Sequence, residues 1–237
     1  MLKNKKVVII GGSSGIGLES AKQLVAQGTE VIIASRSEEK LRIAKEQLGV
    51  RAATFTLDTT QEQQVQSFFE KIGQFDHLVI SAAETSGGSF LHTDTAQARQ
   101  QFENKFWGQY YAAKYGASKI SQNGSITLFS GVVAYKSMVG SAMLGAVNAA
   151  VSNLGQTLAL ELAPIRVNIV SPGIIDTPSR SKMPEEARNN FYATVENKLP
   201  VKRIGRAEDV AQSVIYLLQN SFVTGTVLHV EGGHILA

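Results

Sequence analysis

Short apolar runs alternate along the whole chain with longer segments of helical spacing. Seven runs have the composition of buried strands, at residues 6–10, 30–34, 51–57, 76–82, 125–129, 165–170 and 226–230. The segments between them predict helices, among them one with an apolar face at Val65, Phe68, Phe69 and Ile72, and longer ones over about 95–119, 141–162 and 207–218. This alternation predicts a parallel sheet covered by helices on both faces.

The order of these elements defines the expected fold class. We predict an α/β protein with a doubly wound, parallel, seven-stranded sheet, the Rossmann fold, in a single domain over residues 1–237. Ligands of such sheets bind beyond the carboxyl ends of the strands. Pro172 and Gly173 end the sixth strand, and a polar stretch follows in which short helices can form. Its part over about 178–200 has the composition of a substrate lid.

Composition excludes several classes of function. The 237 residues include no cysteine, which rules out a disulfide, a thiolate zinc site and a cysteine nucleophile, and the four histidines lack metal-ligand spacing, so we expect no metal. The net charge of +3 forms no basic stripe despite a sequence pI near 9.0, so we expect no nucleic-acid partner. Because no apolar stretch matches a membrane span or a signal peptide, we expect no membrane association and a cytoplasmic location.

A glycine-rich turn joins the first predicted strand to the first predicted helix, and a second strand follows at the distance of a βαβ unit. Small residues let such a turn approach a pyrophosphate, and the helix that follows presents free N–H groups and the positive end of its dipole. The predicted phosphate cradle consists of Gly11, Ser13, Ser14, Gly15, Ile16 and Gly17. The alternative is an ordinary glycine turn in an α/β protein.

The end of the second strand indicates which dinucleotide binds. A carboxylate about 20 residues after the glycine turn normally accepts from the ribose hydroxyls and repels a 2′-phosphate. Here the strand ends in Ser35 and Arg36, and a guanidinium with a neighbouring hydroxyl suits phosphate oxygens. We therefore predict NADP(H) as the cofactor, the alternative being that Arg36 is a solvated surface residue. Asp58, after the third strand, is positioned to accept from the adenine amino group.

Several short motifs occur in this chain at the positions where members of one known family have corresponding motifs. The turn from Gly11 to Gly17 follows the pattern TGxxxGxG with Ile10 in place of Thr, and Thr224-Gly225 and residues 230–233 form a C-terminal signature. Together with Asp58, Ser81-Ala82-Ala83 and residues 171–177, these motifs resemble the short-chain dehydrogenase/reductase family over essentially the whole chain. The resemblance implies that Asp58 contacts adenine, and that Ser81, Ala82 and Ala83 line the end of the fourth strand. It also implies that the loop with Pro172, Gly173, Ile175 and Thr177 holds the nicotinamide carboxamide.

The catalytic residues of that family are not matched. Its reductases use a Tyr and a Lys four residues apart on one helix, a Ser about thirteen residues earlier, and an Asn on the preceding long helix. Residues at i and i+4 share a helix face, so the Lys lowers the pKa of the Tyr that protonates the substrate oxygen. The resemblance places Leu144 at the Tyr, Asn148 at the Lys, Gly131 at the Ser and Lys105 at the Asn. The family mechanism therefore cannot be carried over.

A rearranged set of catalytic residues is the remaining option. Lys105 offers an ammonium near the place where the alkoxide forms, and partial desolvation lowers the pKa of a lysine. Ser130 offers a hydroxyl, Asn148 can hold the ribose hydroxyls of the cofactor, and Tyr135 is a further proton donor if its loop folds inward. The structural alternatives are a surface cation or an ion pair with Glu103 or Asp94 for Lys105, a strand-end cap for Ser130, and an exposed loop residue for Tyr135.

The helix predicted over 141–162 indicates self-association. It contains one charged residue, Glu161, and many small ones, so both of its faces are expected to be buried. One face can pack on the sheet and the other on a second subunit, with the aromatic residues of the preceding helix extending that surface. We predict a homodimer or homotetramer, with burial under the chain's own loops as the alternative.

Three functions remain open from the sequence. The first is an NADPH-dependent oxidoreductase that acts on a carbonyl or activated double bond of a small organic substrate through an atypical active site. The second is an NADPH-binding sensor or structural protein without turnover. The third is a non-redox enzyme such as a lyase or dehydratase on the same scaffold, since fold alone does not determine chemistry.

Overall fold

The structure is a computed structural model that describes residues 2–82, 87–181 and 183–237. Its centre is a seven-stranded parallel sheet with the strand order β3-β2-β1-β4-β5-β6-β9. The strands are β1 (Lys6–Ile10), β2 (Glu30–Ser35), β3 (Ala52–Thr56), β4 (Phe75–Ile80), β5 (Ile120–Phe129), β6 (Arg166–Pro172) and β9 (Val227–Val230). The predicted fold class is therefore confirmed, with seven parallel strands wound in both directions from β1.

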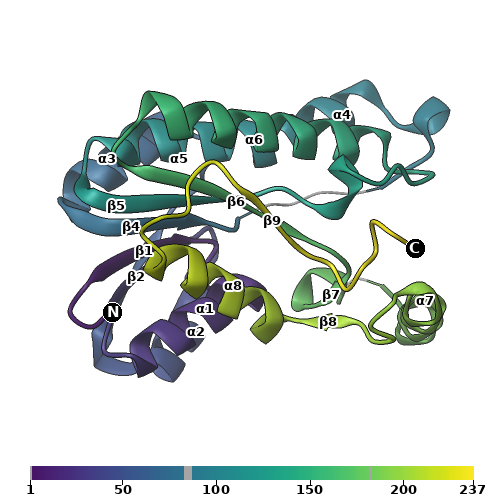
Figure 1. Ribbon diagram of the computed structural model, residues 1–237, viewed down its shortest axis with the longest axis horizontal. Helices are drawn as coiled ribbons and strands as arrows, with labels where there is room; N and C mark the ends of the chain where they lie inside the picture. The colour runs from purple at the N-terminus through teal and green to yellow at the C-terminus, as the bar shows by residue number, and fades with distance from the viewer. Residues whose placement is uncertain (1, 83–86, 182) are drawn as a thin grey trace.

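Helices cover both faces of the sheet, as Figure 1 shows. One layer contains α1 (Gly15–Ala26), α2 (Glu38–Leu48) and α8 (Ala207–Gln219), and the other contains α3 (Glu62–Ile72), α4 (Thr95–Phe102), α5 (Gly108–Ala117) and α6 (Ala142–Glu161). Each face of the sheet has its own core of aliphatic and aromatic side chains, because both faces of every central strand are apolar. None of the described helices is long and apolar enough to cross a membrane.

The strand register brings the ends of the central strands level. Ile10, the last residue of β1, pairs with Ala34 of β2 on one side and with Ile80 of β4 on the other. Leu128 of β5 pairs with Ile80 in turn. The residues that follow these strands therefore lie along one edge of the sheet, where parallel α/β folds bind their ligands.

The structure differs from the predicted elements in two places. The helix expected over 95–119 is divided by a π-helical turn, η3 (Glu103–Trp107), between α4 and α5. The polar stretch after β6 contains a short parallel pair, β7 (Ile175–Asp176) with β8 (Gly205–Arg206), and a 14-residue helix, α7 (Glu185–Lys198), in place of short helices.

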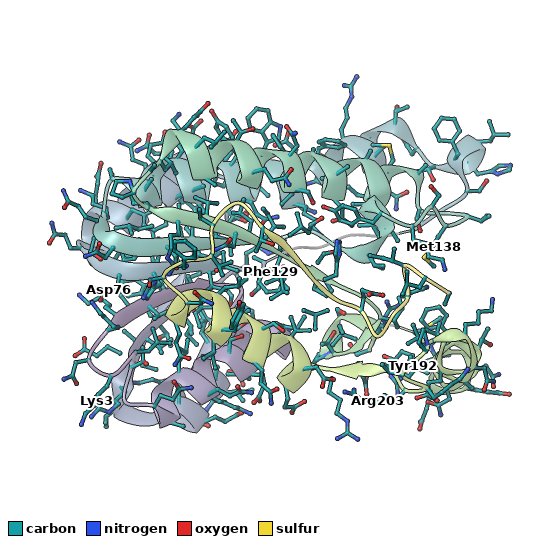
Figure 2. The ribbon with its side chains drawn as sticks, in the orientation of Figure 1. Lys3, Asp76, Phe129, Met138, Tyr192 and Arg203 are labelled. Atoms are coloured by element: carbon teal, nitrogen blue, oxygen red, sulfur yellow. The ribbon has the colours of Figure 1, made fainter. Side chains whose placement is uncertain are left out.

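Helix α7 lies outside the two helical layers, at the end of the molecule where the central strands finish (Figure 1). It has a small core of its own, formed by Ile174, Val195, Leu199 and Ile204. Figure 2 shows Tyr192 of α7 and Met138 of the loop after β5 at this same end of the molecule, and Asp76 at the opposite end.

Candidate functional site

The glycine turn is packed so tightly that two of its positions exclude a side chain. Gly11 has φ +88°, its N–H donates to Ala34 O at 2.8 Å, and a Cβ there would lie 2.5 Å from Ala82 N. A Cβ on Gly17 would collide with Gly11 O and lie 2.6 Å from Ser81 Oγ. The glycines thus allow β1, β4 and α1 to converge at one point, as the predicted cradle requires.

Among the described residues, no side chain accepts from the N–H groups in the first turn of α1. Ser14 is the N-cap residue, but its hydroxyl accepts no capping hydrogen bond, and the first turn contains no acidic residue. Ser13 and Ile16 lie beside it, partly exposed. Free N–H groups at a helix start with no competing carboxylate favour an anion such as a pyrophosphate.

The loop after β6 meets the glycine turn. A Cβ on Gly15, which has φ +53°, would lie 3.4 Å from Cβ of Thr177. Gly173 N donates to Val230 O of the central sheet at 3.0 Å, and Ile175, 7% exposed, pairs with Gly205 in the separate β7–β8 sheet, so the segment is anchored at two points. The structure thus brings the loop of Pro172, Gly173, Ile175 and Thr177 next to the predicted cradle.

The end of β2 lies on the other side of the cradle. The Ser35 hydroxyl is buried and has no hydrogen-bond partner among the described residues. Arg36 is exposed, and Ser37 caps α2 by accepting from Lys40 N at 3.3 Å. Ser35, directly before Arg36 in the chain, therefore has a hydroxyl that the described residues leave without a partner.

Two further predicted positions lie on the same edge. Asp58 follows β3, and its Oδ1 accepts from Thr60 N at 3.0 Å and Thr60 Oγ1 at 2.8 Å. Ser81 and Ala82 follow β4, where Ser81 N donates to Ile10 O at 2.9 Å and Ala82 N to the same oxygen at 3.1 Å. Ala83, which was predicted with them, lies outside the described residues.

The three predicted catalytic residues come together beyond β5. Lys105, in the π-helical turn, is 6% exposed, and its Nζ donates to Ser130 O at 2.9 Å. Ser130 Oγ donates to Asn148 O at 2.9 Å, which links the end of β5 to α6. Lys105 is therefore no surface cation, and the described residues include no ion pair between it and Glu103 or Asp94.

Burial determines the charge state of this lysine. Loss of water around the ammonium lowers the pKa of Lys105 from 10.5 to about 8, and no charged neighbour contributes to that change. A buried lysine with a pKa near working pH can hold a proton and release it. Asn148, 1% exposed, has an unpaired buried Oδ1 among the described residues, so this site has an unused hydrogen-bond acceptor as well.

The sequence did not single out two buried polar neighbours. Ser152 Oγ lies 2.7 Å from Ser130 Oγ and 3.1 Å from Asn148 O. Gln109 forms hydrogen bonds with the backbone of Lys105 and of Phe129. Ser152 lies four residues after Asn148, and Gln109 lies four residues after Lys105. This spacing puts each of them on the same helix face as a predicted site residue, which is the sequence signal that could have identified them.

Tyr135 and the predicted lid lie outside this cluster of buried polar groups. Tyr135 is 41% exposed and packs edge-on against His229, with 4.6 Å between ring centroids, which fits its interpretation as a loop residue. In the predicted lid, the Arg180 guanidinium lies 5.0 Å from the centre of the Phe191 ring, and the Tyr192 hydroxyl donates to Asp176 Oδ1 at 3.0 Å. Within the described part of the chain, no three His, Asp or Glu side chains gather as metal ligands.

Comparisons with known proteins match this chain over nearly its full length. The family model described as enoyl-(acyl carrier protein) reductase matches residues 11–234. Carbonyl reductase family member 4 of Xenopus laevis is 32% identical over 238 residues, which cover 97% of this chain and 98% of that protein. The 3-oxoacyl-(acyl-carrier-protein) reductase of Mus musculus is 30% identical over 237 residues, with coverage of 97% and 98%.

Solved structures agree with the sequence relatives. The crystal structure of a small-chain dehydrogenase in complex with NADPH has 39% sequence identity and a TM-score of 0.88, covering 99% of this chain and 100% of that chain. The structure of ElxO with NADP bound has 28% identity and a TM-score of 0.90, with coverage of 99% and 100%. The similarity thus extends over the sheet, both helical layers and the segment that contains α7.

Proposed function

Because the chain belongs to the short-chain dehydrogenase/reductase family, we propose that it is an NADPH-dependent oxidoreductase. Its substrate would be a small organic molecule with a carbonyl or an activated double bond. The main support for this proposal is the close approach of the glycine turn and the loop after β6, since a Cβ on Gly15 would lie only 3.4 Å from Cβ of Thr177. This contact joins the predicted phosphate and nicotinamide ends of one dinucleotide site.

The residues on this edge suit NADP(H). The first turn of α1, which Ser14 does not cap, would bind the pyrophosphate. Ser35 and Arg36 would bind the 2′-phosphate, because no carboxylate stands at their positions to repel it. Asp58 would accept from the adenine amino group. Two similar structures hold NADPH or NADP, which supports the same cofactor here.

The acceptor side of the site has an unusual composition for this family. Helix α6 contains neither tyrosine nor lysine, and Leu144 and Asn148 stand where the resemblance places that pair. Gly131 cannot carry the family's serine without movement, since a Cβ there would lie 2.8 Å from Asn148 Nδ2. We therefore propose an atypical active site in which Lys105 takes over the role of cation and proton donor.

Bound NADPH would supply a hydride to the substrate. Lys105 uses one N–H for Ser130 O, and its remaining donors would stabilise negative charge on the substrate oxygen and then protonate it. Ser152 lies within hydrogen-bond distance of Asn148 O and can replace Ser130 there, which would release the Ser130 hydroxyl toward the substrate. Asn148 Oδ1, an acceptor that the described residues leave unpaired, would hold a ribose hydroxyl.

Three wider proposals accompany this function. The segment 178–200 would act as a lid, because α7 packs on its own small core at the open end of the sheet. A homodimer or homotetramer would cover the outer face of α6, where Leu160 is 81% exposed, together with Trp107 of η3, which is 37% exposed. A cytoplasmic location stays a prediction from the sequence pattern, which matches neither a membrane span nor a signal peptide.

Turnover of NADPH with a panel of carbonyl and enone substrates tests the proposal. We expect consumption of NADPH absorbance with at least one substrate class, and a fall in kcat of about 10²-fold or more in Lys105→Met with NADPH affinity unchanged. Lys114→Met is the matched control, because Lys114 is an exposed lysine on α5 that pairs only with exposed Glu62 among the described acids. Equal kcat values for the parent protein and Lys105→Met would remove Lys105 from the mechanism.

One observation favours a second candidate, an NADPH-binding protein without turnover. The Lys105 ammonium is bonded to a backbone carbonyl in the interior, and α6 offers no phenol as a substitute acid. Such a protein would bind NADPH with no consumption across the whole panel, in the presence and absence of substrates. The same titration and absorbance measurements therefore separate the two candidates.

A further inference from the structure

Gln109 connects the π-helical turn with the end of β5 through three buried hydrogen bonds. Its side chain is 1% exposed, and its Nε2 donates to Lys105 O at 3.2 Å and to Phe129 O at 3.0 Å. Its Oε1 accepts from Phe129 N at 2.8 Å. The amide of Gln109 thus contacts the backbone of the residue that carries the ammonium and of the residue before Ser130.

The bonds to Phe129 take the place of a strand partner that the described residues do not provide on this side. The last pair between β4 and β5 is Ile80 with Leu128, so Phe129 lies one residue beyond the ladder on that side. Ser130 N donates instead toward β6, to Val170 O at 2.9 Å. A primary amide offers one acceptor and two donors, which lets Gln109 pair with the N–H and the C=O of Phe129 as a neighbouring strand would.

The bond to Lys105 O closes a ring of interactions. In a π-helical turn the backbone partner of each carbonyl moves by one residue, and such turns occur frequently at functional sites. From Lys105 O the ring runs through Gln109 to Phe129, along the chain to Ser130 O, and back through the Nζ of Lys105. The ammonium and the end of β5 cannot move apart unless one of these buried bonds breaks.

We propose that Gln109 is a positioning residue that holds the Lys105 ammonium at the end of β5, in the place from which it acts on the substrate. The catalytic consequence of this proposal rests on the proposed function above, whereas the structural consequence does not. Buried bonds in a low-dielectric interior are strong and directional, and a displacement of about 1 Å at a reacting group lowers rates by about 10²-fold.

The pKa of Lys105 reports whether its ammonium lies in the buried place at the end of β5. The polar side chains around its end of β5 are neutral, namely Gln109, Ser130, Asn148 and Ser152. Burial alone lowers the pKa of Lys105 to about 8. A lysine that leaves this place gains access to water, so its pKa rises toward the ordinary value of 10.5.

The experiment replaces Gln109 and follows Lys105 directly. Gln109→Met keeps the length of the side chain and removes all three bonds, and Gln109→Leu removes them with a shorter side chain. Gln100→Met is the matched control, because Gln100 is an exposed glutamine in α4 whose side chain bonds only Asn104 among the described residues. NMR titration of carbon-labelled lysine side chains, assigned with Lys105→Met, gives the pKa of Lys105 in each protein.

We expect the pKa of Lys105 to rise in Gln109→Met and to stay unchanged in Gln100→Met. With a turned-over substrate, kcat should fall between about tenfold and hundredfold in Gln109→Met, with the Kd of NADPH unchanged. A Lys105 that titrates at the same pH in Gln109→Met as in the parent protein would overturn the proposal.

A wrong proposed function and a wrong role for Gln109 give different experimental results. If the parent protein shows no turnover, or if Lys105→Met keeps full kcat, the catalytic assignment is wrong while the lysine titration still decides the role of Gln109. If Gln109→Met does not fold, Gln109→Leu provides the same titration without a new charge. The pKa of Lys105 should again rise, and an unchanged pKa would contradict the proposal.

Discussion

Replacement of Lys105 by methionine tests whether the structure holds an ammonium in a dry interior, and it needs no assay of activity. Lys105 is 6% exposed, and its Nζ bonds the backbone carbonyl of Ser130. Methionine has similar length and no charge, so the variant removes the titrating group and the free-energy cost of burying a charged ammonium. The loss of the bond to Ser130 O should destabilise the variant by about 1–3 kcal/mol at every pH, because a neutral lysine also donates.

The informative quantity is therefore the change of the stability difference with pH. The pKa of Lys105 is about 8 in the folded protein and near 10.5 when the chain is unfolded. Between these values the unfolded chain binds a proton that the folded chain has released, so the free energy of unfolding rises with pH. The gap, at about 1.36 kcal/mol for each pKa unit, corresponds to about 3 kcal/mol.

Urea unfolding followed by circular dichroism provides the assay, for the parent protein and Lys105→Met from pH 7 to pH 10.5. We expect the parent protein to gain about 3 kcal/mol relative to the variant over the interval above pH 8. All other titrating groups are common to both proteins and cancel in the difference. Parallel stability curves would show that the Lys105 ammonium is solvated, and the structural basis of its catalytic role would be refuted.

Three further predictions concern other parts of the molecule. Burial lowers the pKa of His77 to about 4, so the parent protein should lose up to about 3 kcal/mol relative to His77→Asn as the pH falls from 6.5 toward 4, measured by urea unfolding. Gly17→Ala should lower Tm and abolish NADPH binding in a fluorescence titration, because its Cβ collides with Gly11 O; retained affinity would contradict the packing of the turn. Gly131→Ser should cost about 1–3 kcal/mol in urea unfolding, because its Cβ would lie 2.8 Å from Asn148 Nδ2, and the double variant with Asn148→Ala should recover most of it.

Much of the fold could be predicted because it depends on local patterns. Apolar runs without interruption indicate strands buried on both faces, and all seven predicted strands occur, with ends that differ by a few residues. The glycine turn was recognisable because Gly11 and Gly17 have a packing role that a side chain would prevent. The predicted position of Pro172 at the end of the sixth strand is confirmed as well.

The rest depends on contacts between distant residues. Residues 103–107 contain no glycine or proline that would indicate a π-helical turn, and the bonds that accompany this turn reach Phe129, the last residue of β5, and Ser130 after it. For the same reason the sequence could not decide whether Lys105 is buried or a surface cation. The pair β7 and β8 has two residues in each strand, which is too short for any periodicity to show.

Calorimetric titration of the parent protein with NADPH and with NADH measures whether the end of β2 selects a nucleotide with a 2′-phosphate. Charge-assisted hydrogen bonds from the end of β2 to the 2′-phosphate contribute about 1.5–3 kcal/mol each, and about 1.4 kcal/mol corresponds to a tenfold change in Kd. We expect NADPH to bind at least about tenfold more tightly than NADH, and Arg36→Ala to lose this preference. Equal or tighter binding of NADH, or no binding of either nucleotide, would contradict it.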